Sequence, residues 1–164
     1  VDRNVYDIIE LRTAKHPSET DLYLVTRILA CCLHHEDGAT MSRAGLCDPD
    51  GPPVLARDLT GRLTHWIDIG LPAGPRLHKA TKVADQVSVY SHKEPTVHLT
   101  TLAKAQIHRA SEIQFYSLYD QFLSEVAQTL GRNNRWTLVR TEGELFLTID
   151  DSTVQGPLIR HSLG

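Results

Sequence analysis

The sequence lacks the features of a membrane protein and of a disulfide-stabilised secreted protein. No apolar stretch reaches the roughly 18 residues that a membrane-spanning helix needs, and we recognise no signal peptide. Only three cysteines occur, Cys31, Cys32 and Cys47, and an odd number with two adjacent members is a poor disulfide framework. We therefore expect a cytoplasmic protein in a reducing compartment, without membrane partners.

The sequence also lacks a net positive charge. Its 17 lysines and arginines stand against 20 acidic residues, a formal net charge of −3. No overall basic field therefore indicates nucleic acid, although a local basic groove is compatible with this total. Among the nine histidines, no two have the H-x-x-x-H spacing of a helical metal site.

What is present is an ordinary globular composition. The 164 residues are 41% hydrophobic and 23% charged, which predicts one domain over residues 1–164 with a substantial core. Because the chain begins at Val1 rather than at a methionine, we expect a leading segment to be missing.

Hydrophobic periodicity predicts alternating helices and strands. The first helix is expected to have Ser18 as its N-cap and to end near His35. The elements expected after it are strands Thr40–Leu46, Val54–Asp58 and Leu63–Ile69, helix Arg76–Asp85, strand Gln86–Ser91, a helix within Pro95–Ala110, strand Ile113–Leu118, helix Asp120–Leu130 and a closing hairpin of Arg135–Arg140 and Leu145–Ile149. This order predicts an α/β (α+β) domain with a mixed sheet flanked by helices.

Several segments resemble the YaeQ family of bacterial proteins in their order and spacing. They are Asp2-Arg3, Ala14–Thr20 (AKHPSET), Arg43–Leu46 (RAGL) and His65–Pro72 (HWIDIGLP), and the Asp150-Asp151 pair fits the family's tail. The resemblance covers nearly the whole chain. It implies a restriction-endonuclease-like PD-(D/E)XK core, made of a helix, a three-strand meander, a helix and a strand. It also implies a further strand before Val1.

The same resemblance implies a phosphodiesterase site. Glu19 matches the acid on the first helix, and Asp68 matches the second acid on the third strand. Asp58, near the hairpin turn, is the candidate for the first acid by its position. Mg²⁺ or Mn²⁺ held by Asp58 and Asp68 would activate water to attack a phosphodiester of nucleic acid.

Two positions depart from the nuclease pattern. Gly70 stands where such enzymes have a lysine, and Pro53 stands where a Pro-acid pair would place a carboxylate. Lys79 is the candidate for a displaced catalytic lysine, although helical periodicity places it opposite the expected buried face. Arg76 and His78 flank that face and are expected to reach the edge of the site.

Each candidate also has a structural interpretation. Glu19 suits the first turn of a helix, Asp58 suits a turn, and Lys79 suits a solvated helix face. The functional interpretation is favoured for Asp68, because a carboxylate in so apolar a strand must be paired, exposed or bound to a metal. The run His34–Asp37 is interpreted as a polar helix end rather than a metal site, since adjacent helical histidines point about 100° apart.

Two functions follow from these observations. The first is a divalent-metal-dependent phosphodiesterase acting on nucleic acid, favoured by Glu19 and Asp68. The second is a catalytically degenerate module that binds nucleic acid or another protein, favoured by Gly70 and Pro53.

Overall fold

The computed structural model describes residues 20–42, 51–131 and 135–163. Its elements are α1 (Asp21–Leu33), the 3-10 turn η1 (His35–Asp37), β1 (Thr40–Met41), β2 (Val54–Arg57), β3 (Leu63–Ile69), α2 (Gly74–Val83), β4 (Gln86–Ser91), α3 (Thr96–Lys104), η3 (Ala110–Glu112), β5 (Gln114–Leu118), α4 (Asp120–Gln128), β6 (Trp136–Thr141), β7 (Glu144–Ile149) and β8 (Ser152–His161). The predicted order of helix, meander, helix and strand is confirmed. Within the described ranges, no helix is long and apolar enough to cross a membrane.

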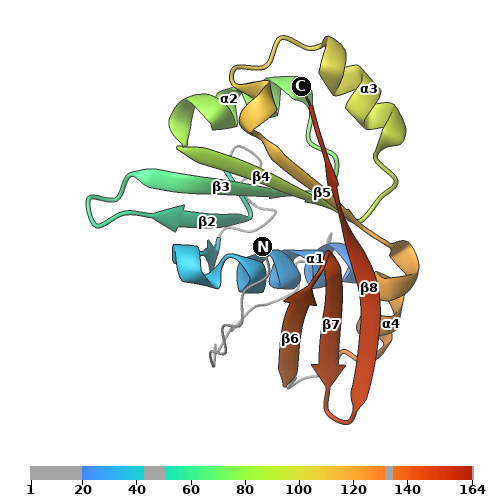
Figure 1. Ribbon diagram of the computed structural model, residues 1–164. Helices are drawn as coiled ribbons and strands as arrows, with labels where there is room; N and C mark the ends of the chain where they lie inside the picture. Colours follow the sequence, from blue (N-terminus) through green and yellow to red (C-terminus); the bar gives the residue numbers. More distant parts are fainter. Residues whose placement is uncertain (1–19, 43–50, 132–134, 164) are drawn as a thin grey trace.

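In the described part of the chain, eight strands form one curled, mixed sheet in the order β1-β2-β3-β4-β5-β8-β7-β6. Strands β3, β4 and β5 are parallel neighbours, and the other pairings are antiparallel. The carboxyl ends of these three parallel strands therefore lie at one edge. Figure 1 shows β6, β7 and the first part of β8 turned away from β2–β5, so that the sheet curls around α1 and α4.

Helices cover both faces of this sheet, with α1 and α4 on one side and α2 and α3 on the other (Figure 1). The core on the α1 side contains Val25 and Ile67, and the core on the α2 side contains Trp66 and Leu77. Successive side chains of a strand point to opposite faces. Both faces of β3 are consequently buried: Trp66 and Asp68 face α2, whereas His65 and Ile67 face α1.

Helix α1 begins later than the sequence predicted. The N-cap is Thr20 rather than Ser18, and the Thr20 hydroxyl accepts a hydrogen bond from the Tyr23 backbone N–H at 3.1 Å. Both residues carry a hydroxyl that can cap a helix, so composition alone did not separate them. Glu19 therefore precedes the helix and lies outside the described residues, as do Cys47 and most of the predicted strand Thr40–Leu46.

Strand β8 was not predicted, because Gly156 and Pro157 are residues that usually interrupt strands. In the structure this segment is the longest strand of the described residues, and its pairing partner changes near Gly156 and Pro157. Residues Ser152–Pro157 pair with β7, whereas Leu158–His161 pair with β5. Gly156 also permits α4 to pack closely, since a Cβ atom at this position would lie 2.5 Å from the Phe122 ring.

We predict that Gly156→Ala destabilises the protein by about 1–3 kcal/mol, because the added methyl group overlaps the Phe122 side chain. Urea unfolding would measure the change. Gln155→Ala, at the exposed neighbouring position, should change stability by no more than about 0.5 kcal/mol. Equal unfolding midpoints for the two variants would contradict the close packing of α4 on β8.

Candidate functional site

Asp68 lies near the carboxyl end of β3 and is almost completely buried, with 2% of its surface exposed. Arg76 of α2 binds both carboxylate oxygens, through Nε to Oδ2 at 2.8 Å and through Nη2 to Oδ1 at 2.9 Å. The same Nη2 donates to the Gly51 carbonyl oxygen at 2.7 Å. The Arg76 guanidinium carbon lies 5.4 Å from the centre of the Trp66 ring. Asp68 is thus held in a bidentate ion pair.

Strand alternation and helix position bring this pair together. Trp66 and Asp68 share the β3 face that points toward α2, and Arg76 stands in the first turn of that helix. Leu77 and Ala80 of the same helix are buried in the core. The predicted reach of Arg76 to the edge of the site is therefore seen, and its partner is the carboxylate.

Asp58 lies at the other end of the hairpin, in the exposed turn between β2 and β3. Its Oδ1 accepts hydrogen bonds from the Thr60 hydroxyl and from the backbone N–H groups of Thr60 and Arg62. The Thr60 hydroxyl, with smaller contributions from these backbone groups, holds the pKa of Asp58 below its ordinary value. These contacts are those of a turn-stabilising carboxylate.

The structure does not bring Asp58 and Asp68 together. The Asp58 backbone N–H pairs with the Arg62 carbonyl oxygen, and six residues of strand, about 20 Å at roughly 3.3 Å per residue, separate Arg62 from Asp68. Carboxylates that share a Mg²⁺ ion each place an oxygen about 2.1 Å from it. Since both Asp68 oxygens bind Arg76, these two residues do not fit a common metal ion.

Three further positions singled out from the sequence remain, namely Lys79, Glu19 and Gly70. Lys79 is exposed on α2, as helical periodicity predicted, and Glu19 lies outside the described residues. Gly70 has a φ of +98°, and its N–H donates to the Tyr90 carbonyl oxygen at 2.9 Å. A lysine at position 70 would be strained in this left-handed conformation, which gives a backbone reason for the glycine.

A second polar cluster lies on the opposite face of β3, and the sequence analysis missed it. His34, Asp37 and His65 place one potential ligand atom each within 4.8 Å of one another. The local run His34–Asp37 supplies only two of the three residues, and the third comes from β3. The spacing of His34 and Asp37 at i and i+3, together with a histidine in an otherwise apolar strand, was the available signal.

Charge is unevenly distributed along the chain. Residues 74–109, which include α2 and α3, contain six lysines and arginines and two acidic residues, a formal charge of +4, while the remaining residues sum to −7. We call residues 74–109 the basic segment. Its four lysines are exposed, namely Lys79, Lys82, Lys93 and Lys104. The two helices of this segment therefore present a positive outer surface.

The two remaining cations of the basic segment are used inside the fold. Arg76 binds Asp68, and Arg109 donates to the carbonyl oxygens of Thr81 and Ala84 near the end of α2. These two arginines therefore serve contacts within the fold, whereas the four lysines have exposed side chains.

An open pocket of about 340 Å³ lies where β4 and β5 end at the carboxyl edge. Its lining includes His92 and Lys93 from the end of β4, and Asp120 from the start of α4. Burial, assisted by the nearby Lys93 charge, lowers the pKa of His92. With both signs of charge present, the pocket has no clear preference for an anion or a cation.

The fold and these sites define a mixed α+β protein with a buried ion pair at the end of its third strand and a basic segment that contains α2, β4 and α3. Comparison with known proteins identifies the family. The profile of the family described as "YaeQ protein" matches residues 1–157. The chain therefore belongs to the YaeQ family.

Relatives and solved structures agree with this assignment. The Escherichia coli K12 relative, named uncharacterized protein YaeQ, is 24% identical over 156 residues, covering 94% of this chain and 86% of the relative. The Salmonella typhi YaeQ is 28% identical over 125 residues, covering 76% and 66%.

Two crystal structures of YaeQ proteins are also similar. The Pseudomonas syringae protein superposes with a TM-score of 0.86 at 24% identity, covering 98% of this chain and 89% of that one. The Xanthomonas axonopodis pv. citri protein has a TM-score of 0.82 at 28% identity, covering 92% and 85%.

We predict that Arg76→Gln lowers the free energy of unfolding by about 3–5 kcal/mol, because it leaves the buried Asp68 carboxylate without its partner. Arg62→Gln provides a matched control: it breaks the exposed Arg62–Asp85 pair and should cost less than about 1 kcal/mol. Chemical denaturation would measure both.

The double variant Asp68→Asn/Arg76→Gln should cost less than the sum of its single changes, since the two residues interact directly. Simple additivity would contradict the ion pair.

For Asp58 we predict that Thr60→Val raises the carboxyl pKa toward its ordinary value, because the strongest hydrogen bond is removed. A depressed folded-state pKa stabilises the hairpin above the ordinary pKa, and this contribution is lost as the pH falls through the folded value. NMR titration of the Asp58 carboxyl carbon would measure the shift. Thr64→Val changes a threonine that bonds Ala56 instead, and should leave this pKa unchanged.

Proposed function

We propose that this YaeQ-family protein is a catalytically degenerate nuclease-like module that binds nucleic acid through the exposed lysines of its basic segment. The observation that carries the proposal is the charge of +4 on residues 74–109 in a chain whose other residues sum to −7. The phosphate backbone of nucleic acid is the common polyanion that such a surface attracts.

The geometry around Asp68 supports binding over hydrolysis. The restriction-endonuclease-like PD-(D/E)XK core implied by the family resemblance would use this carboxylate to hold Mg²⁺ or Mn²⁺. In this protein Arg76 already neutralises Asp68 through two hydrogen bonds. We therefore assign no hydrolytic step to Asp58, Asp68 and Lys79, and interpret the position of Asp68 as structural.

A protein-interaction role has less support from the described surface. The large apolar side chains that are exposed there come from separate elements: Leu59, Val83, Val97 and Tyr119. Scattered exposed apolar residues are normal on a soluble surface. Exposed lysines on consecutive turns of α2, by contrast, are a specific feature that a phosphate-bearing ligand would use.

The proposal predicts salt-dependent binding of DNA or RNA that Lys79→Gln/Lys82→Gln weakens for all sequences alike. If both lysines contact phosphates of duplex DNA, the slope of log affinity against log salt should fall in magnitude by about 1.8. Fluorescence anisotropy with labelled single-stranded and duplex oligonucleotides, at several salt concentrations, would measure both effects.

The matched control is Arg135→Gln/Arg160→Gln, which removes the same charge from exposed positions near β6 and on β8. It should leave the slope nearly unchanged. An equal loss of nucleic-acid affinity in both double variants would show that binding depends on net charge alone, and would contradict the assigned surface. The same samples should be incubated with Mg²⁺ or Mn²⁺, and cleavage that Asp68→Asn abolishes would overturn the degenerate assignment.

A further inference from the structure

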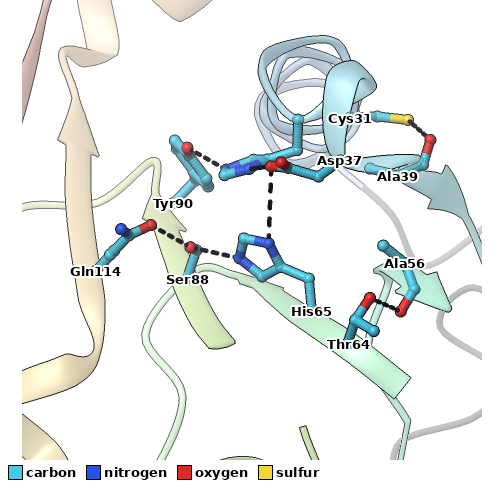
Figure 2. A network of polar contacts seen from close by, with 10 residues as sticks. Cys31, Asp37, Ala39, Ala56, Thr64, His65, Ser88, Tyr90 and Gln114 are labelled. Atoms are coloured by element: carbon cyan, nitrogen blue, oxygen red, sulfur yellow. Dashed lines mark hydrogen bonds and ion pairs between the residues drawn. The ribbon is translucent and has the colours of Figure 1, made fainter. Parts of the chain in front are cut away.

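Three polar residues meet on the α1 face of β3, opposite the face that carries the Asp68–Arg76 ion pair. His34 follows the last turn of α1, Asp37 lies in η1, and His65 lies in β3. The Asp37 Oδ2 atom is 3.0 Å from His34 Nδ1 and 3.9 Å from His65 Nδ1. Figure 2 shows Asp37 facing His65, with Ser88, Gln114 and Tyr90 beside them.

The tautomer of His65 follows from its hydrogen bonds. The Ser88 hydroxyl donates to Gln114 Oε1 at 3.0 Å, so it accepts from His65 Nε2–H at 2.8 Å. The other ring nitrogen, Nδ1, then bears a lone pair. It is buried, points toward the Asp37 carboxylate and has no hydrogen-bond partner among the described residues.

The contact between His65 Nδ1 and Asp37 is unfavourable in this tautomer. The imidazole directs its lone pair at a carboxylate oxygen 3.9 Å away. Two electron-rich atoms that face each other repel, and a cation between them would turn this repulsion into attraction.

His34 is oriented to complete such a site. Its Nε2 lies 2.6 Å from the Tyr90 hydroxyl, and its Nδ1 faces the Asp37 carboxylate. For Nδ1 to bind a metal, its proton must leave, and the Tyr90 oxygen can accept a hydrogen bond from a proton placed on Nε2 instead. Both histidines thus have an outer partner on Nε2, as metal-binding histidines usually do.

We propose that His34 Nδ1, the Asp37 carboxylate and His65 Nδ1 bind one Zn²⁺ ion. Ligand atoms about 2.0–2.2 Å from a tetrahedral zinc ion are about 3.3–3.6 Å apart. The distances from Asp37 Oδ2 to His34 Nδ1 and to His65 Nδ1, 3.0 and 3.9 Å, bracket this range. The Asp37 side chain is 44% exposed, which provides a route from solvent and leaves a fourth position to water.

The donor set favours zinc over magnesium. Two imidazole nitrogens suit a borderline transition-metal ion, whereas Mg²⁺ requires mainly oxygen ligands. The order Ser88, His65, Asp37 is also that of a hydrolase triad, yet Ser88 is completely buried and its proton is committed to Gln114. A substrate would not reach that hydroxyl, so the cluster is interpreted as a metal site.

The test uses the untagged full chain, stripped of metal by chelation and kept in a non-thiol reductant. We expect one Zn²⁺ per chain by isothermal titration, with Mg²⁺ giving no saturable heat. Co²⁺ should give the visible absorption of tetrahedral nitrogen and oxygen coordination. Long-range ¹H–¹⁵N spectra should show the His34 proton moving from Nδ1 to Nε2 when Zn²⁺ binds.

Asp37→Asn should reduce zinc affinity at least about hundredfold, because loss of an outer-shell partner alone typically costs 10- to 100-fold. Its amide oxygen can still accept the His34 hydrogen bond, and Asp37 is exposed, so the variant should fold. Glu36→Gln removes a carboxylate from the same turn outside the cluster, and should bind zinc normally.

Three results would overturn the site. The first is a folded wild-type protein that binds no Zn²⁺ at ~0.1 mM. The second is equal zinc affinity in the Asp37→Asn and Glu36→Gln variants. The third is a Co²⁺ spectrum with thiolate charge-transfer bands, which would locate the ion at cysteines.

Discussion

The burial of β3 on both faces is the constraint on which the rest of the structure depends. Helix α2 covers one face and α1 covers the other, so a polar side chain in this strand must find its partner inside the protein. Asp68 finds Arg76 on α2, and His65 finds Ser88 on β4. These contacts join β3 to α2 and to β4, the two elements that follow it in the chain.

The sequence predicted the faces of β3 but not the partners of its polar residues. Strand alternation correctly grouped Trp66 with Asp68, and helical periodicity correctly buried Leu77 and Ala80. The cost of burying Asp68 was also foreseen. The Asp68 carboxylate is stabilised by a contact between two elements, β3 and α2. Local spacing carries no information on which of several nearby cations makes that contact.

The same limit explains the missed cluster. His34 and Asp37 belong to one turn, and the local pattern was interpreted as a polar helix end. His65 stands 31 positions after His34 and meets these two residues because α1 packs across β3. Strand β8 was missed for a different reason: Gly156 and Pro157 have low strand propensity, and their place in the strand depends on Phe122 and on a change of pairing partner.

The two polar centres of β3 differ in how completely they are satisfied, and this difference separates their chemistry. Arg76 carries a permanent charge and directional donors, so both Asp68 oxygens have a hydrogen-bond donor within the protein itself. His65 in its neutral form leaves one buried lone pair directed at a carboxylate, which a bound cation would satisfy. Cation binding is therefore expected on the α1 face. Beyond the ion pair, on the outer surface of α2, the exposed lysines favour an anion.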